Sequence, residues 1–131
     1  MIGLDTNVLV RYVAQDDTIQ SPKATALIES FTVEKPGFVS LVSVVELVWV
    51  LTGCYASNKN EICEVLEILL RTKELNVSEA EVVWKALRQY RDNNADFADC
   101  LIAFLGAQVG CEHTFTFDKG AAKGCGMKII V

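Results

Sequence analysis

Histidine and proline are scarce in this chain, and its cysteines follow no metal-binding pattern. Only one of the 131 residues is histidine and two are proline. A Ser-His-Asp or Cys-His catalytic system would therefore have to be built on His113. No third and fourth ligand with zinc-like spacing accompanies Cys111 and His113, which argues against a zinc centre. No C-x-x-C pair is present. We expect the five cysteines to be small, buried, apolar residues of a protein in a reducing compartment: Cys54, Cys63, Cys100, Cys111 and Cys125.

Segments that would insert into or cross a membrane are also lacking. The longest apolar run, Phe38 to Cys54, is shorter than the roughly 20 residues that a span needs, and it carries Glu46 in its middle. The first residues, "MIGLDTNV", contain no basic region and reach an acid at Asp5, unlike a secretory signal. We expect a cytoplasmic protein with no membrane partner.

The composition is that of one ordinary globular domain over residues 1–131. Hydrophobic residues make up 51% and charged residues 22% of the chain, which excludes disorder and low complexity. The net charge of −5 argues against a nucleic-acid partner, because phosphate binding usually depends on a basic surface. That objection fails if several acids converge on metal ions, since bound cations reverse the local field.

Apolar periodicity alternates between strand-like and helical segments along the whole chain. This alternation predicts an α/β fold with a parallel central sheet covered by helices on both faces. The segment around "FDKGAAKGCG" has the composition of turns. The patterns predict strands at 1–5, 37–40, 74–77, 113–118 and 127–131, with helices at 6–14, 21–31, 43–51, 61–72, 81–90 and 96–108.

Several helix starts have capping patterns. Asn58 and Glu61 frame the start of one helix. The S-x-x-E capping box, in which the serine caps the helix, fits both Ser43-Val44-Val45-Glu46 and Ser78 to Glu81. Ser21 and Pro22 predict another start, with proline at the first helical position.

Four acids from distant segments follow predicted strands or begin helices at one edge of this sheet. Asp5 ends the first strand and Asp118 ends the strand at 113–118, while Asp99 and Glu46 belong to helices entered from the same edge. Ligands of open α/β sheets bind outside the carboxyl ends of the strands. We therefore expect these four carboxylates to converge.

Each acid also has a local explanation. Acids suit helix N-termini, so Asp5 is explained equally well as a cap of the first helix, and Asp118 as a turn or cap residue. Asp96 could cap its helix while Asp99 carries the chemistry. Glu46 favours function, because a carboxylate among Val44, Val45, Leu47 and Val48 is costly unless it is paired or bound to a metal.

Four segments resemble the successive motifs of PIN-domain ribonucleases, and most closely those of the VapC-type toxins of toxin-antitoxin pairs. They are "LDTNVLVRYV" at 4–13, "SVVELVWVLTG" at 43–53, "DFADCLIAFLGA" at 96–107 and "TFTFDKGAAK" at 114–123. The resemblance covers essentially the whole chain in order. It implies a PIN-like three-layer sandwich with a central, mostly parallel sheet and helices on both faces.

The resemblance also assigns roles to residues. The family's acids fall on Asp5, Glu46 and Asp99, with the commonly present fourth on Asp118, and these four are the implied catalytic and metal-binding residues. Supporting positions fall on Thr6 and Thr116, whose hydroxyls orient acids or water, and on the additional acid Asp96. Departures from the pattern lie at Cys100, at Phe104-Leu105 and at Ala121-Ala122.

Carboxylates repel a phosphodiester, whereas hard cations of the Mg²⁺ or Mn²⁺ type take carboxylate oxygens as ligands. We expect Asp5 and Asp99 to hold the principal ion, with Glu46 and Asp118 completing the site. The resemblance implies single-stranded RNA as substrate, a homodimer, and a small antitoxin as protein partner. Basic residues that could contact flanking phosphates are Arg11, Lys119 and Lys123.

Other function classes remain open on the sequence. Within the same family the chain could be a housekeeping RNA-processing nuclease or a non-catalytic PIN-like interaction module, although the complete acid set argues against the latter. Phosphotransferases with an aspartyl nucleophile, such as haloacid-dehalogenase-like enzymes, also place an Asp after the first strand. They require a second Asp two residues on, where this chain has Asn7.

Overall fold

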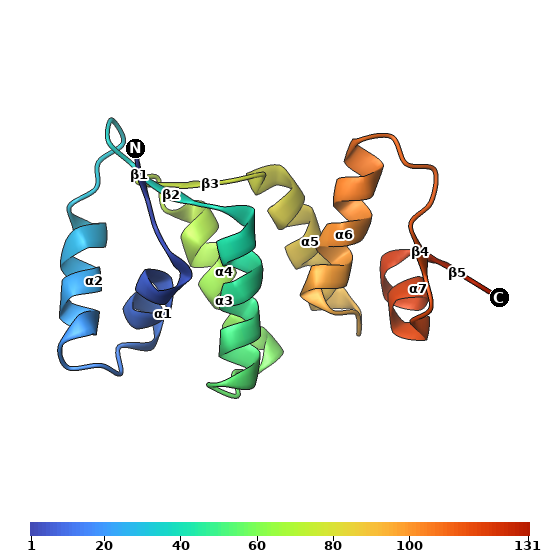
Figure 1. Cartoon of the computed structure of the whole chain (residues 1–131), viewed down its shortest axis with the longest axis horizontal. Helices are drawn as coiled ribbons and strands as arrows, with labels where there is room; N and C mark the ends of the chain where they lie inside the picture. The colour runs from blue at the N-terminus through green and yellow to red at the C-terminus, as the bar shows by residue number, and fades with distance from the viewer. The chain divides into compact units, whose positions relative to one another are not determined.

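The computed structural model describes all of residues 1–131, and the chain forms two compact units, Met1–Ser78 and Glu79–Val131. Figure 1 shows the order of the elements along the chain. The first unit contains β1 (Ile2–Gly3), α1 (Thr6–Ala14), α2 (Gln20–Glu29), β2 (Gly37–Val39), α3 (Leu41–Gly53), α4 (Lys59–Arg71) and β3 (Leu75–Val77). The second unit contains α5 (Ala80–Asp92), α6 (Phe97–Gln108), β4 (Phe115–Thr116), α7 (Lys119–Cys125) and β5 (Lys128–Ile129).

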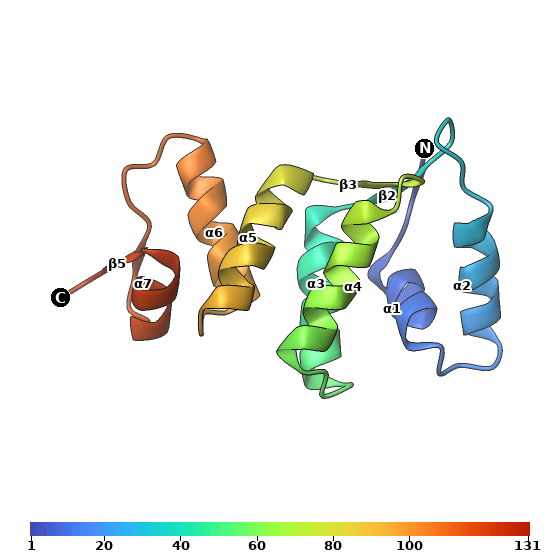
Figure 2. The same cartoon turned by 180° about the vertical axis from the view of Figure 1, so that it is seen from behind.

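The first unit is built on a three-stranded parallel sheet in the order β1-β2-β3. Its central strand, β2, pairs Gly37 with Ile2 on one side and with Leu75 on the other. A Cβ at Gly37 would lie 2.5 Å from the ring of Phe31, so only glycine fits under that ring. Helices α1 and α2 pack together, as do α3 and α4 (Figure 2). Their buried core includes Leu9, Val39, Val44, Leu47, Ile62 and Leu66.

The second unit packs α5 against α6 and α7, and pairs β4 with β5 in parallel (Figure 1). Phe97 and Leu87 are fully buried there, and the rings of Phe97 and Tyr90 meet edge to face at 5.9 Å. A Cβ at Gly124 would lie 2.6 Å from the Cβ of Ala95. This contact fixes α7 against the segment before α6, and the hydrogen bond from the Gln89 amide to the Gly124 carbonyl joins α7 to α5.

The α/β fold with parallel strands is confirmed in both units, and the strands form two sheets, one in each unit. The predicted start at Asn58 is confirmed as a capping box, with Asn58 accepting from the Glu61 N–H and Glu61 accepting from the Asn58 N–H. The capping box is a local pattern that needs no tertiary information. It was therefore readable from the sequence alone.

Two other predicted capping boxes are wrong. Helix α3 is capped by Ser40, whose Oγ accepts from the Ser43 N–H, so Ser43 lies inside the helix. Helix α5 begins after Glu79, which has a left-handed backbone and makes no capping hydrogen bond through its side chain. The backbone of Ser78 instead continues the sheet, with its N–H donating to the Val39 carbonyl.

Helix α7 replaces the turns predicted around residues 117–126. Three glycines suggested turns, but Asp118 caps the helix, Ala121 is buried, and Gly126 ends it with a φ of 70°. Helix α2 also starts one residue earlier than expected, at Gln20. The Asp17 carboxylate accepts from two N–H groups at that start, and these backbone hydrogen bonds lower the pKa of Asp17.

The cysteines are less uniform than expected. Cys63 and Cys100 are buried and Cys125 is half-buried, but Cys54 and Cys111 are exposed, so the prediction of five buried residues is wrong at these two. No disulfide is present. None of the helices has the length and apolar character needed to cross a membrane.

Candidate functional site

Asp5 lies between the end of β1 and the start of α1. The Leu4 N–H still donates to the Phe38 carbonyl, which extends the pairing of β1 up to the residue before the acid. Asp5 then adopts an extended backbone and caps α1, its Oδ1 accepting from the Thr6 N–H at 2.8 Å. The side chain is exposed, and its second oxygen has no partner within this unit. One oxygen therefore anchors the carboxylate while the other remains available to a ligand.

Glu46 lies beside Thr6 in the same unit. The Thr6 hydroxyl donates to Glu46 Oε1 at 2.6 Å, a short bond as expected for a charged acceptor. Glu46 is exposed in its unit, so the expectation that its apolar neighbours enclose it is wrong. Val44, Leu47 and Val48 point into the core from other faces of α3, because a helix turns by about 100° per residue.

A chain of hydroxyls supports that bond. Thr6 Oγ1 lies 3.3 Å from Ser43 Oγ, which lies 3.2 Å from Ser40 Oγ. Each hydroxyl has one hydrogen, and Thr6 gives its own to the carboxylate, so the hydrogen between Thr6 and Ser43 comes from Ser43. Ser40 in turn donates to Ser43. The donors run in one direction, from Ser40 to the Glu46 carboxylate, and the two middle members are buried.

Asp99 occupies the first turn of α6 in the second unit. Desolvation by burial raises the pKa of Asp99, and the negative charges of Asp96 and Asp118 raise it further. Asp96 stands at the cap position of α6 but makes no capping hydrogen bond through its side chain. The charges of Asp96 and Asp118 thus act on Asp99, and none of these three carboxylates forms an ion pair.

Asp118 is anchored in the same way as Asp5. Its Oδ1 accepts from the N–H groups of Gly120 and Ala121 at the start of α7, at 2.7 and 3.1 Å. Thr116 Oγ1 accepts from the Asp118 N–H at 3.0 Å, which fixes the turn between β4 and α7. The interpretation of Asp118 as a helix cap is therefore correct, and its other carboxylate oxygen is left free for a ligand.

The donor set suits a hard cation. All the candidate ligands are carboxylates, with hydroxyls beside them and no thiolate or imidazole among them, as Mg²⁺ and Mn²⁺ prefer. Asp5 and Glu46 lie in the first unit, and Asp96, Asp99 and Asp118 lie in the second. No group of three His, Cys, Asp or Glu side chains that could hold a metal ion is formed.

A family model described as "PIN domain" matches residues 2–126. The chain belongs to the PIN domain family. It is also similar to a protein named VapC ribonuclease from Aquifex aeolicus (strain VF5), at 26% identity over 121 residues. That alignment covers 88% of this chain and 86% of the relative. The family resemblance expected from the four sequence motifs is thus confirmed.

Two residues of this PIN domain that support the candidate site were missed by the sequence reasoning. Ser40 and Ser43 orient Thr6 toward Glu46, but Ser43 was assigned to a capping box. The signal was present as a spacing of three residues between Ser40, Ser43 and Glu46, which places them along one helix face. The link to Thr6 was invisible, because it joins positions 40 residues apart.

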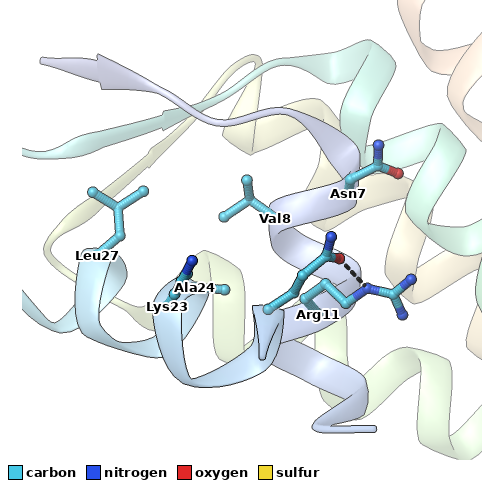
Figure 3. A pocket seen from close by; sticks show the side chains of 7 residues that line it. Asn7, Val8, Arg11, Lys23, Ala24 and Leu27 are labelled. Atoms are coloured by element: carbon cyan, nitrogen blue, oxygen red, sulfur yellow. Dashed lines mark hydrogen bonds between the residues drawn. The ribbon is translucent and has the colours of Figure 1, made fainter. Parts of the chain in front are cut away.

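An apolar cavity beside α1 has none of the candidate acids among its lining residues. It has a volume of about 290 Å³ and lies between α1 and α2 (Figure 3). It is lined by Asn7, Val8, Arg11, Gln20, Lys23, Ala24 and Leu27. No carboxylate faces it, so the cavity offers no ligand to a hard cation.

Of the three basic residues expected near phosphates, Arg11 has structural partners. Its guanidinium contacts Gln20 and Tyr55 and forms an ion pair with Asp16 at 3.3 Å. The Tyr55 hydroxyl donates to Asp16, and this bond raises the pKa of Tyr55. The structure gives Arg11 a role in joining α1 to the end of α3. Lys119 and Lys123 are exposed on α7.

Proposed function

We propose that this PIN domain is a metal-dependent endoribonuclease that hydrolyses single-stranded RNA, and that it is the toxin of a toxin-antitoxin pair. One observation carries the proposal: burial and the negative charges of Asp96 and Asp118 raise the pKa of Asp99, and no basic side chain forms an ion pair with any of the three. A cation relieves that repulsion. Membership of the PIN family and similarity to a VapC ribonuclease support the same reaction class.

In this proposal Asp5 and Asp99 hold the principal ion, and Glu46 and Asp118 complete the site directly or through water. Thr6 holds one oxygen of Glu46, and the backbone of α7 holds one oxygen of Asp118, so the remaining oxygens are presented in fixed directions. Mg²⁺ or Mn²⁺ bound there supplies positive charge to the scissile phosphate and lowers the pKa of the attacking water. Asp96, at the cap position of α6, would accept a proton from the attacking water.

We further propose that the two units act together as a single domain over residues 1–131, because both contribute acids. We also propose that the protein acts in the cytoplasm. A homodimer and an antitoxin that covers the acids of the site are proposed from the resemblance to VapC toxins. A protein with a net charge of −5 and exposed carboxylates suits a partner with a basic segment. Light scattering after size exclusion, alone and with the product of the neighbouring reading frame, tests both; a monomer that ignores that product contradicts them.

The nuclease proposal is tested by titrating the wild type and Asp99→Asn with Mn²⁺ and Mg²⁺ while scoring cleavage of mixed single-stranded RNA. We expect cleavage that requires metal and is lost in the variant. Asp92→Asn, an exposed acid of the same unit, serves as the matched control and keeps full activity. Metal-dependent cleavage by Asp99→Asn contradicts the assignment. Absence of metal binding in the wild type favours a non-catalytic interaction module, and cleavage confined to one precursor RNA favours a processing nuclease.

A further inference from the structure

Two thiols of the second unit lie in contact. Cys100 on α6 and Cys125, the last residue of α7, have their sulfur atoms 3.5 Å apart. Neither cysteine is in a disulfide; Cys100 is fully buried and Cys125 is half-buried. The pair brings together two helices, one that contains Asp99 and one that begins after Asp118.

Small molecules have a route to the pair. Cys125 lines a cavity of about 190 Å³ together with Cys111, His113 and Met127. A cavity of that size admits several water-sized molecules, and hence a small peroxide. Cys125 therefore meets an oxidant first, and the buried Cys100 lies next to it as the second thiol.

We propose that Cys100 and Cys125 form a site of reversible oxidation that closes to a disulfide on exposure to a peroxide. The Cys125 sulfur attacks a peroxide oxygen, the O–O bond breaks, and the thiol proton passes to the leaving oxygen, giving a sulfenic acid and an alcohol or water. The Cys100 sulfur then attacks Cys125 Sγ, the S–O bond breaks, and the hydroxide leaves as water with the Cys100 proton. Two thiols and one peroxide give one disulfide, one alcohol and one water, with two electrons passing from sulfur to oxygen.

Closure has a consequence for the proposed nuclease, and this step rests on that proposed function. A disulfide holds its sulfurs about 2.05 Å apart. The sulfurs must therefore approach by about 1.4 Å from their present separation. Asp99 is the neighbour of Cys100, and a displacement of about 1 Å in a catalytic group costs on the order of 100-fold in rate. Oxidation is therefore expected to lower RNA cleavage, and reduction to restore it.

The chemical test follows the thiols and does not depend on activity. The full chain is treated with hydrogen peroxide, blocked with an alkylating reagent and digested with trypsin. Desolvation by burial raises the pKa of Cys125, so the exposure must be long. The last basic residue before Cys100 is Arg91 and the next is Lys119, so trypsin leaves Cys100 and Cys111 in one peptide and Cys125 in a short second peptide. Because Cys100 and Cys111 share one peptide, the Cys111→Ser variant shows which of these two cysteines is linked to Cys125.

We expect the two peptides to be joined in the wild type and in Cys111→Ser, and separated by dithiothreitol. Cys125→Ser is expected to show no link to this short peptide. The proposal is overturned if Cys100 and Cys125 are both recovered alkylated, if the link disappears in Cys111→Ser, or if Cys125 goes on to sulfinic acid. Cys100→Ala, checked by thermal melting, shows whether the link needs the buried thiol.

The functional test compares cleavage by reduced and oxidised protein. Oxidation is expected to lower cleavage at least 10-fold in the wild type and in Cys111→Ser, with recovery in dithiothreitol, and to leave Cys125→Ser unchanged. A link that forms without loss of cleavage refutes the effect on Asp99. If the reduced wild type does not cleave RNA, the proposed function fails, while the peptides still decide whether the disulfide forms.

Discussion

Replacing Thr6 by valine tests whether the hydroxyl chain positions Glu46. Valine has nearly the shape of threonine, but it removes the donor that lies 2.6 Å from Glu46 Oε1. It also leaves the Ser43 hydroxyl without its acceptor. The substitution therefore removes the last bond of the chain while the packing around residue 6 is preserved.

The size of the effect follows from burial. A hydrogen bond to a charged group contributes about 1.5–3 kcal/mol, but water can replace the donor at the exposed Glu46, so we take about 1 kcal/mol. Ser43 is buried, and its orphaned hydroxyl adds about 1 kcal/mol. At about 3–5 °C per kcal/mol for a chain of this size, the total of about 2 kcal/mol lowers Tm by about 6–10 °C.

The assay pairs thermal melting with metal-dependent RNA cleavage. Thr6→Val is expected to melt earlier and to cleave at least about 10-fold more slowly, since 1.4 kcal/mol of lost positioning equals one factor of 10. Thr6→Ser keeps the hydroxyl and is expected to retain most of the melting temperature and most of the cleavage rate. Thr52→Val is the matched control on α3, because that hydroxyl bonds only to the Val48 carbonyl of its own helix. If Thr6→Val and Thr6→Ser melt and cleave alike, the hydroxyl chain has no role in positioning Glu46.

Three further predictions concern single residues. In metal-free buffer Asp99→Asn is expected to raise Tm at pH 7. Because the pKa of Asp99 is raised in the folded state, its contribution to stability is present below the unfolded pKa and is lost as pH rises through the folded pKa. Asparagine carries no charge and does not lose this contribution. Melting curves from pH 7 downward should show the gain shrinking as the pH falls through the raised folded pKa, with no gain left below the ordinary Asp pKa of about 4, and a constant gain would contradict this cause. Asp118→Asn is expected to keep the cap of α7 and the melting temperature while losing metal-dependent cleavage. Asp118→Ala should lose the cap as well as cleavage, with about 1 kcal/mol less stability in denaturant titrations. Equal cleavage by Asp118→Asn and the wild type would show that Asp118 is not part of the site. Gly37→Ala should cost about 1–3 kcal/mol in the same titrations, because its Cβ would lie 2.5 Å from the Phe31 ring, and an unchanged midpoint would show that the ring moves freely.

Some of the features that local sequence determines were predicted correctly, although two of the three capping boxes were not. The Asn58 capping box and the strand-helix alternation depend on residues a few positions apart, and both are confirmed. Features that depend on packing were not predicted. Helix α7 forms despite its glycines because Ala121 is buried and Gly124 fits closely against Ala95. The Thr6–Glu46 bond joins two elements far apart in the chain, and neither its donor nor its direction is visible in the sequence.

A helix-capping role for Asp5 and Asp118 does not exclude a metal-binding role. Asp5 and Asp118 each cap a helix through one oxygen, Oδ1, and keep the other oxygen free of partners within their units. A backbone amide holds a carboxylate more rigidly than a flexible side chain does, since the amide direction is fixed by the helix. Capping therefore orients the free oxygen at no cost to its availability. Asp96, at a cap position without a capping bond, lacks this anchor, which suits a proton acceptor more than a fixed ligand. Asp96→Asn should accordingly lower the rate of RNA cleavage while leaving Mn²⁺ affinity nearly unchanged, and a loss of affinity equal to that in Asp99→Asn would show that Asp96 is a ligand.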